Sequence, residues 1–409
     1  MNRKSDSNKT VIVVGNGMVG HKFIDTMIAR GEHLTWNVVT FCEEPRLAYD
    51  RVYLSSFFAG KTAEDLSLLP RPTFYAENGI TVHLGSKVVS IDKAAKTVTS
   101  STGEVLAYDK LVLATGSFPF VPPVTGRDAT GCFVYRTIED LVAMQHHATS
   151  SKVGVVIGGG LLGLECASAL KNMGLETHVV EFASRLMTVQ VDDGGGAILK
   201  RKIESMGVKV HLNRNTSEIV KSADGRIDKM TFIDPVTQKP AGELKTDMIV
   251  FSAGIRPRDE LGKQAGLGMG ERGGINVDDH CVTSDADILA IGECALYKNR
   301  IYGLVAPGYH MATVAVDTIT RKLEPLTFTG FDMSTKLKLL GVEVGSFGDA
   351  FARTPGSREI AMHDNAAGTY KKLVLSADGT KVMGGVLVGD TSQYGELSSL
   401  TRDGEVLSV

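Results

Sequence analysis

Three glycines, Gly158, Gly160 and Gly163, stand at the spacing G-x-G-x-x-G directly after an apolar run. In such a set the first glycine permits a tight turn, and the second lets a pyrophosphate approach the backbone. The third lets a helix pack closely on a strand. The free amide groups at the start of that helix favour a bound phosphate. The spacing therefore indicates a dinucleotide site; the alternative is a glycine-rich turn without a ligand.

Two acidic residues extend this hypothesis. Glu181 stands where a carboxylate accepts the hydroxyls of an adenosine ribose, which disfavours the 2′-phosphate of NADPH. Arg185 lies nearby in the sequence and could partly compensate, so NADH is favoured and NADPH stays possible. Glu165 falls in the first helical turn, where it could bind a nicotinamide carboxamide or simply complement the helix dipole. We include the turn residues Leu161 and Leu162 among the cofactor contacts.

The elements that must position these residues can be predicted from the pattern. Val153 to Ile157 is apolar throughout, which is typical of a buried parallel strand. Leu161 to Met173 has the periodicity of a helix, and Gly174 stands where helices commonly end. A second strand is predicted from Thr177 to Val180. Strand, glycine turn, helix and strand are thus in the order of a Rossmann unit.

The chain carries the same arrangement near its N-terminus. A strand is predicted from Val11 to Val14, a helix from Phe23 to Ala29 and a second strand from Val38 to Cys42. Glu43 is the preferred ribose ligand and Glu44 the alternative. The turn residues of this unit are Gly15, Gly17, Met18, Val19 and Gly20. Two such units imply two dinucleotides on one polypeptide, and the simplest reason to bind both is to pass electrons between them.

Other predicted cofactor contacts lie where apolar strands end in glycine. Gly292 and Glu293 follow such a strand, and a carboxylate there can accept the ribityl hydroxyls of a flavin. Val305 and Ala306 precede a helix predicted from Tyr309 to Ile319, whose amide groups would stabilise negative charge on a reduced flavin ring. The remaining candidates are Arg51, Ser55, Ala114, Thr115, Gly116 and Gly254. No catalytic acid, base or nucleophile is evident, and none is required when cofactors supply the chemistry.

Composition excludes several classes of protein. The 409 residues carry a net charge of −3, which argues against nucleic-acid binding. The sequence has no apolar run of about 18 residues, so no membrane span is expected. The five cysteines are scattered without the spacing of a redox dithiol, a metal site or an iron–sulfur cluster. With no export signal, we expect a cytoplasmic protein.

The rest of the chain completes the predicted architecture. Residues 80–110 are expected to form a small antiparallel piece that includes 81–84, 87–91 and 97–100. Short strands are also expected within residues 208–250. Asp192 to Gly196 is expected to be a flexible helix start, because no strand precedes it as in a phosphate loop. From about Thr327, strands at 336–339, 342–344, 369–375 and 382–388 suggest an antiparallel sheet for packing or dimerisation.

The motifs in this order resemble the pyridine nucleotide–disulfide oxidoreductase superfamily. More specific stretches lie at residues 41–51, 134–140, 158–165, 255–259, 291–295 and 304–309. They are similar to the N-terminal flavin module of NAD(P)H-dependent assimilatory nitrite reductase large subunits, over nearly the whole chain. The resemblance implies FAD in the first site, NAD(P)H in the second, and usually a dimer. Related reductases carry a lysine thought to lie near the flavin N5 atom, where this chain has Ser56.

The fold predicted is α/β, with two Rossmann-like dinucleotide-binding domains, each of three ββα layers, and a small α+β C-terminal domain. The discontinuous FAD domain is expected at residues 1–120 and 246–326, the NAD(P)H domain at 121–245 and the C-terminal domain at 327–409. The sequence lacks the cysteine-rich iron–sulfur and sirohaem regions of the full nitrite reductase. By this resemblance the chain is a separate reductase component or a piece of a longer protein.

The predicted function is an NAD(P)H-dependent flavoprotein reductase. Hydride passes from NADH to FAD, and electrons then pass to an iron–sulfur, rubredoxin-like or sirohaem protein such as a nitrite or nitrate reductase partner. Two alternatives stay open. One is an NADH oxidase that uses oxygen, and the other is a non-catalytic flavin sensor or assembly subunit.

Overall fold

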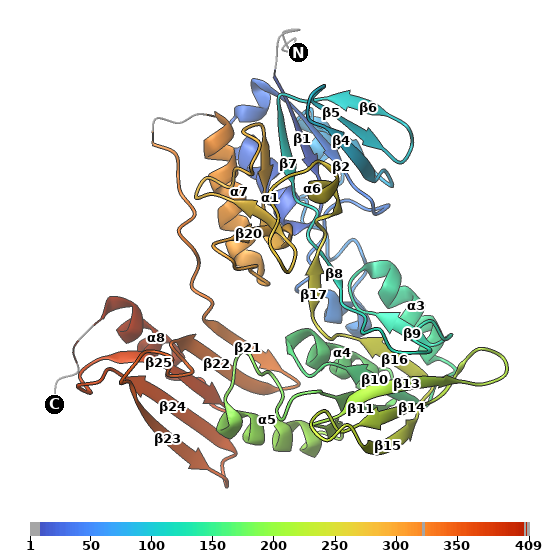
Figure 1. Cartoon of the computed structure of the whole chain (residues 1–409), viewed down its shortest axis with the longest axis vertical. Coiled ribbons are helices and arrows are strands. Elements are labelled where there is room, and N and C mark those ends of the chain that lie inside the picture. Colours follow the sequence, from blue (N-terminus) through green and yellow to red (C-terminus); the bar gives the residue numbers. More distant parts are fainter. Residues whose placement is uncertain (1–8, 321–323, 405, 407–409) are drawn as a thin grey trace. The chain divides into compact units, whose positions relative to one another are not determined.

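The computed structural model describes residues 9–320, 324–404 and 406, which form two compact units (Figure 1). Unit 1 takes in the described parts of residues 1–54, 61–118 and 255–331. Unit 2 takes in residues 55–60 and 119–254 and the described parts of 332–409. Within the described residues, none of the helices combines the length and the apolar character that a membrane span requires.

Unit 1 is built on a parallel five-stranded sheet with the order β19-β7-β1-β2-β3. Central strand β1 is wholly apolar from Val11 to Val14, and all four side chains are buried, as in a strand covered on both faces. The strands are β1 (Lys9–Val14), β2 (Trp36–Phe41), β3 (Thr81–His83), β7 (Lys110–Leu113) and β19 (Ile288–Ala290). Helices α1 (Met18–Ala29) and α7 (Val305–Thr320) pack against one another beside this sheet.

Smaller elements complete unit 1. A three-stranded antiparallel sheet consists of β4 (Val88–Asp92), β5 (Thr97–Ser100) and β6 (Val105–Ala107). Two-stranded pairs are formed by β8 (Ser117–Pro119) with β17 (Ile255–Pro257) and by β18 (Ile275–Val277) with β20 (Ala295–Tyr297). The short helices are η1 (Glu32–Leu34), η2 (Leu54–Ala59), α2 (Phe74–Glu77), α6 (Glu260–Gln264) and η3 (Gly292–Cys294).

Unit 2 repeats this plan with the parallel order β12-β11-β10-β16-β9. The strands are β9 (Cys132–Val134), β10 (Val153–Ile157), β11 (Glu176–Val180), β12 (Lys209–His211) and β16 (Met248–Phe251). Antiparallel strands β13 (Asn215–Lys221), β14 (Ile227–Ile233) and β15 (Pro240–Lys245) share one apolar core with this sheet. The helices are α3 (Ile138–Ala148), α4 (Leu161–Asn172) and α5 (Asp193–Ser205). Side chains along β10 point alternately to the two faces of the parallel sheet. Val155 and Ile157 face the antiparallel sheet, whereas Gly154 lies against Leu170 of α4, so the parallel sheet has a layer on each face.

The C-terminal part of unit 2 is a five-stranded antiparallel sheet with the order β21-β22-β25-β24-β23. Its strands are β21 (Thr335–Leu339), β22 (Val342–Gly348), β23 (Arg358–Asp364), β24 (Thr369–Leu375) and β25 (Val382–Val388). Helix α8 (Tyr394–Asp403) covers part of one face, where Leu397 and Leu400 pack against Phe347 and Leu387.

The start of α5 is the docking point of this sheet. Asp192 caps the helix by accepting from Gly195 N at 3.1 Å, and its other oxygen binds Tyr370 Oη at 2.7 Å and Lys372 Nζ at 2.9 Å. A Cβ on Gly194 would stand 2.6 Å from the Tyr370 ring, so a residue larger than glycine would push the sheet away. The expected helix start at Asp192 to Gly196 is therefore confirmed, and its glycines serve packing.

Two expectations about elements need correction, and two further elements are not predicted. Residues 81–84 are not part of the antiparallel piece, because β3 pairs in parallel with β2 through Thr81 and Val39. Helix α7 begins at Val305, four residues before the predicted start. Strand β23 and helix α8 are absent from the sequence prediction. The fold class itself is confirmed as mixed α/β with two Rossmann-like sheets and a C-terminal domain.

Candidate functional site

The two glycine turns have the same geometry, each within its own unit. Gly15 N donates to Phe41 O at 2.9 Å, and Gly158 N donates to Val180 O at 2.8 Å. Both glycines have positive φ, +109° and +119°, in a region that other residues rarely adopt. Each turn therefore joins β1 or β10 to the following helix through a conformation that needs glycine.

Close backbone contacts make the first and third glycines obligatory. A Cβ on Gly15 would stand 2.3 Å from Ala114 O, and one on Gly158 would stand 2.2 Å from Ser252 O. In both units a Cβ on the third glycine, Gly20 or Gly163, would stand 1.9 Å from the carbonyl oxygen of the first. These distances are far below van der Waals contact, so the glycines set how closely helix and strand approach.

The second glycines face open space. A Cβ on Gly17 or Gly160 would have no protein atom within 4 Å. Each of these glycines is the N-cap of its helix, and neither makes a side-chain cap bond. The amide groups at the two helix starts are therefore available to a phosphate, with room for it to approach. The residues present thus fit one dinucleotide per unit. Met18, Val19, Leu161 and Leu162 lie in the first turns of these helices.

The carboxylate of Glu181 is held against the glycine turn of unit 2. Its Oε2 accepts from Gly159 N at 2.6 Å, and its Oε1 accepts from Ala183 N at 2.8 Å. The residue follows β11 immediately, so its position is fixed by the strand. Two backbone bonds orient the carboxylate while its remaining lone pairs can still accept ribose hydroxyls.

Arg185 is engaged elsewhere in unit 2. Its Nε donates to Val191 O at 2.9 Å, and its guanidinium pairs with Asp193 at 2.8 Å. A Cβ on Gly196 would stand 2.8 Å from Arg185 Cβ, so the side chain lies against the start of α5. The cation expected to compensate for Glu181 is thus neutralised by a neighbouring acid.

Glu165 lies on α4, two residues beyond Gly163. Burial raises the pKa of its carboxyl to about 7. A carboxyl group with this pKa changes charge near neutrality, and it is then well suited to respond to a bound ligand. The sequence indicates Glu165 as a candidate but does not reveal its raised pKa, because burial depends on the packing around the helix.

The two acids of unit 1 are arranged differently. In unit 1 Phe41 is paired with Val14, and in unit 2 Val180 is paired with Ile157 in the same way. The residue of unit 1 that corresponds to Glu181 is therefore Cys42. Glu43 and Glu44 come one and two residues later, and each binds cations.

Glu43 pairs with Arg258 and with Lys87, the latter at 3.3 Å. Burial alone would raise the pKa of Glu43, but Arg258 and Lys87 outweigh burial and lower it. Glu44 pairs with Arg51 and accepts from Tyr49 Oη at 2.6 Å.

A buried network behind the first turn has no counterpart in the sequence prediction. Asn16, which is 3% exposed, donates from Nδ2 to Tyr75 Oη at 3.0 Å and accepts from Ala48 N at 3.1 Å. Tyr75 Oη lies 2.6 Å from His21 Nδ1. Burial lowers the pKa of His21, which favours a neutral ring whose Nδ1 can accept a hydrogen bond from the tyrosine hydroxyl. The network ties the glycine turn to helix α2 and to the loop that contains Ala48, both distant in sequence.

The other predicted contacts of unit 1 gather near the same turn. A Cβ on Gly292 would stand 3.2 Å from Val19 Cγ2, and one on Gly308 would stand 2.6 Å from the same atom. Ser117 Oγ donates to Glu293 Oε2 at 2.7 Å, which orients that carboxylate. Thr115 Oγ1 donates to Arg258 O at 2.6 Å.

Several predicted contacts follow from the backbone. Val305 and Ala306 form the first turn of α7, so their amide groups are among the free N–H groups of that helix. Ala114 receives the close approach of Gly15, and Gly116 has a positive φ of +69°.

Two predicted contacts, Ser55 and Gly254, fall in unit 2 and not in the unit with the first turn. Ser55 belongs to η2, which the chain inserts between two segments of unit 1. Gly254 has a positive φ of +105°, and its carbonyl accepts from Phe120 N at 2.9 Å.

The cysteines offer little reactivity. All five are free thiols, and burial raises the pKa of Cys42, Cys132, Cys166, Cys281 and Cys294. Cys294 is completely buried and lies 3.3 Å from Leu113 O as a hydrogen-bond donor. A raised thiol pKa suppresses the thiolate, which is the reactive form.

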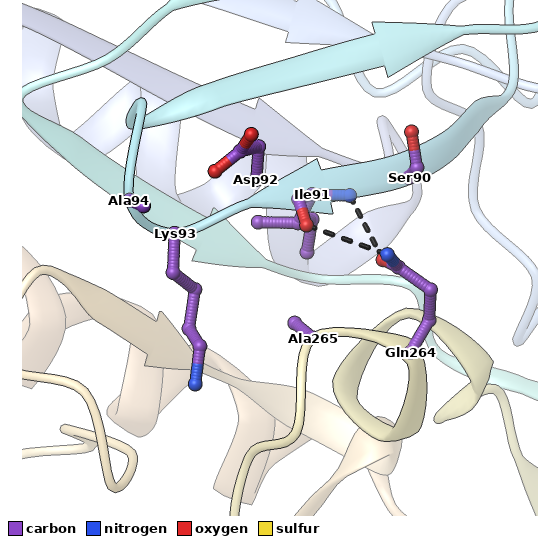
Figure 2. Close-up of a pocket in the computed structure, with 7 residues that line it drawn as sticks. All are labelled: Ser90, Ile91, Asp92, Lys93, Ala94, Gln264 and Ala265. Atoms are coloured by element: carbon purple, nitrogen blue, oxygen red, sulfur yellow. Dashed lines mark hydrogen bonds between the residues drawn. The ribbon is translucent and has the colours of Figure 1, made fainter.

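Unit 1 also has a hollow of about 490 Å³, which is separate from the predicted cofactor contacts. Figure 2 shows Gln264 of α6 reaching β4, where its Oε1 accepts from Ile91 N at 2.9 Å. Lys93 also lines the hollow, and its Nζ donates to Gly266 O at 3.4 Å. None of the predicted cofactor contacts is part of its lining. Its polar groups are used to join α6 to the antiparallel sheet.

Comparison with family models identifies both parts of the chain. Residues 9–318 match the pyridine nucleotide-disulphide oxidoreductase family. Residues 334–405 match the rubredoxin NAD+ reductase C-terminal domain.

Curated relatives share high identity over part of their length. The chain is 52% identical to the nitrite reductase (NADH) large subunit of Escherichia coli (strain K12) over 96% of this chain and 46% of that protein. It is 34% identical to the assimilatory nitrate reductase electron transfer subunit of Bacillus subtilis (strain 168), over 93% of this chain and 48% of that protein. The chain thus spans about half the length of these two relatives.

A solved structure supports the fold. The NAD-dependent persulfide reductase from A. fulgidus has a TM-score of 0.85 and 24% identity, covering 97% of this chain and 77% of that one. The predicted superfamily and the predicted class of enzyme, an oxidoreductase, are confirmed, and FAD and NAD(P)H are the cofactors of this family. The chain therefore belongs to the pyridine nucleotide-disulphide oxidoreductase family.

Proposed function

We propose that the chain is the electron-input module of a nitrite reductase-type system. It would oxidise NADH with FAD and pass the electrons to a protein acceptor. The observation that supports this most strongly is the pair of glycine turns, each with obligatory first and third glycines and an open second glycine. One dinucleotide per unit is what an NADH-dependent flavoprotein needs.

We assign FAD to unit 1 and NADH to unit 2. When bound, FAD would supply the chemistry of hydride acceptance from NADH and electron release to the acceptor. In unit 1 the free amide groups of α1 and α7 would hold the pyrophosphate and favour negative charge on the flavin. Glu293, oriented by Ser117, would accept from the flavin side chain. In unit 2 the α4 amide groups would hold the second pyrophosphate, and Glu165 would accept from the nicotinamide carboxamide.

We propose NADH over NADPH as the preferred donor. Glu181 is fixed by two backbone amide groups, so it cannot easily move away from a 2′-phosphate. Arg185 is paired with Asp193, so it is poorly placed to bind that phosphate. Both contacts favour the 2′-hydroxyl of NADH.

The proposed acceptor is an iron–sulfur, rubredoxin-like or sirohaem protein. Support comes from the relatives, which are a nitrite reductase large subunit and a nitrate reductase electron transfer subunit. The C-terminal match to rubredoxin NAD+ reductases points in the same direction. We further propose the domain boundaries and the cytoplasmic location given above, and a homodimer.

Anaerobic stopped-flow mixing of the FAD-loaded chain with NADH tests the proposal. We expect rapid loss of the visible flavin absorbance, followed by its return when a protein acceptor is added. NADPH is expected to react more slowly at equal concentration. Flavin that stays oxidised for minutes in the presence of NADH would contradict a reductase and would support a sensor. Rapid oxygen uptake by the reduced chain, faster than transfer to any protein acceptor, would instead support the oxidase.

A further inference from the structure

Strand β23 is an open edge of the C-terminal sheet. It pairs with β24 on one side, and no strand of the described residues pairs with its other side (Figure 1). All seven of its residues are exposed, including Ile360 at 59% and Met362 at 68%. A straight edge of this length presents unpaired N–H and C=O groups that can pair with another strand.

The opposite edge of the same sheet is protected. Strand β21 carries Lys336 and Lys338, which are exposed and alternate along the edge. Lysines on an edge strand are a common means of preventing strand addition. Strand β23 has no lysine, no proline and no bulge in its pairing with β24. The two edges therefore differ in whether they permit a neighbour.

The sequence of β23 is complementary to itself in the antiparallel direction. If Ala361 faces Ala361 of a second copy, Arg358 faces Asp364 and Glu359 faces His363. Ile360 then faces Met362, so the two exposed apolar residues cover one another. Directly opposed residues in an antiparallel pair have close side chains, so opposite charges and apolar pairs there are stabilising.

Other registers lose these pairings. A shift of two residues in one direction places Asp364 opposite Ile360, and a shift in the other places Arg358 opposite Met362. A parallel pairing in register would place like charges side by side. Charge therefore selects one register and one direction.

We propose that two copies of this chain associate through β23, antiparallel and centred on Ala361, to form a continuous ten-stranded sheet. The two-fold axis would stand perpendicular to the sheet at Ala361. Such an axis leaves both α8 helices on one face of the sheet and both α5 helices on the other. The proposal specifies the surface of the homodimer suggested above and does not depend on electron transfer.

Ala361→Cys tests the register directly. Opposed Cα atoms in an antiparallel pair lie about 4.5–5.5 Å apart, within the range of about 4.4–6.8 Å that a disulfide spans. We expect Ala361→Cys to form a disulfide-linked dimer under mild oxidation, seen on a non-reducing gel. The matched control is Lys338→Cys on the protected edge, together with the parent chain and its five cysteines. Equal cross-linking of all three proteins would overturn the proposed register.

Charge exchange tests the pairing without a covalent bond. Arg358→Asp places two acids opposite one another at both ends of the contact. We expect the dimer dissociation constant to rise about ten- to a hundredfold, measured by analytical ultracentrifugation. The double variant Arg358→Asp/Asp364→Arg restores opposite charges and should restore most of the affinity. Ile360→Lys should give a folded monomer.

Reduction of bound FAD by NADH should be unchanged in Arg358→Asp, which separates failure of this interface from failure of the proposed reductase function. A parent chain that stays monomeric at high concentration would overturn the proposal. So would a dimer whose affinity is the same in the parent, Arg358→Asp and Ile360→Lys.

Discussion

The two acids near the glycine turn of unit 2 differ in what surrounds their carboxyl groups. Glu181 accepts from two backbone amide groups, whereas the environment of Glu165 is dominated by burial, which raises its pKa to about 7. A carboxylate held by amide groups is suited to a fixed contact with ribose. A carboxyl group that titrates near neutrality can change its interaction with a ligand as pH changes. We therefore expect different kinetic effects from changes at the two positions.

Glu165→Gln should remove a pH dependence. The carboxylate, which accepts from the nicotinamide amide more strongly than the acid does, forms as pH rises through about 7. The KM for NADH should therefore fall between about pH 6 and 8 in the parent and stay nearly flat in the variant. A steady-state pH profile measures this. Identical profiles in the two proteins would contradict a role for Glu165 in binding.

The same group also has a predicted effect on stability. The pKa is raised in the folded state, so the folded protein keeps a proton that the unfolded chain releases at a lower pH. The contribution of Glu165 is therefore favourable below its unfolded pKa and is lost as pH rises through about 7. Glu165→Gln should be more stable than the parent above neutrality, as measured by urea denaturation at several pH values.

Glu181→Ala should weaken NADH binding. Loss of a charged acceptor for ribose hydroxyls should raise the KM for NADH about tenfold, with a smaller or opposite effect on NADPH. Initial-rate measurements with both donors give the ratio. Glu218→Ala, an exposed acid on β13 of the same unit, is the matched control and should change neither KM. An equal loss with both donors would argue against the proposed ribose contact.

Tyr75→Phe should destabilise the first glycine turn by breaking the buried network that supports it. The variant removes the hydroxyl that joins Asn16 to His21 and leaves buried polar groups without a partner. The free energy of unfolding should fall by about 1–3 kcal/mol, and FAD should dissociate more readily. Denaturant titration of the chain without FAD and fluorescence titration with FAD measure the two effects. The control is Tyr108→Phe in the same unit; an equal loss there would show a general effect of removing a buried hydroxyl.

At the scale of elements, the open space beside the second glycine of each turn allows the binding of NADH and the binding of FAD to be blocked separately. Gly160→Val adds a side chain where no protein atom lies within 4 Å of a Cβ, so unit 2 should fold while NADH is excluded. We expect FAD to bind normally and its reduction by NADH to be lost. Gly17→Val is the matched variant in unit 1 and should give a folded, colourless protein. Absorbance spectra, circular dichroism and stopped-flow reduction distinguish these results.

The strand–turn–helix units can be predicted from sequence because several local signals agree. Buried strands β1 and β10 are apolar throughout their cores, and glycines at fixed spacing mark the turns that follow. Strand β23 cannot be found in this way. Its seven residues are all exposed and mix charged and apolar types without a period of two. Strand β3 is predicted in the wrong sheet because three residues carry no signal of which strand they pair with.

Parts of the candidate site also lie beyond local patterns. Asn16, His21 and Tyr75 meet only because the fold brings α2 behind the first turn, and no spacing in the sequence indicates this. In unit 2 the proposed ribose acid, Glu181, can be located because it directly follows a strand. The residue that directly follows β2 in unit 1 is Cys42, so the same criterion does not choose between Glu43 and Glu44. Burial of Glu165 likewise depends on neighbours that are distant in sequence.

At the scale of the whole molecule, the chain is expected to deliver electrons without reducing nitrite. The cysteine spacing predicts no iron–sulfur ligand set, and the role proposed for the chain is to pass electrons to a separate acceptor. With NADH and FAD, the chain should reduce ferricyanide or a small iron–sulfur protein and leave nitrite unchanged. Nitrite assays alongside NADH oxidation test this. Nitrite consumption by the purified chain would contradict the proposed division of labour.

Residues 119–254 of unit 2 are inserted between two segments of unit 1, and this order has a consequence for biosynthesis. Strand β19, which completes the parallel sheet of unit 1, and helix α7 leave the ribosome after every strand of the parallel sheet of unit 2. The nascent chain therefore carries an unfinished first half while the inserted half already has its parallel core. In a fragment that stops before residue 288, β7 would be an uncovered edge and a site of aggregation. Any expression fragment that includes the first glycine turn should therefore extend through Thr320.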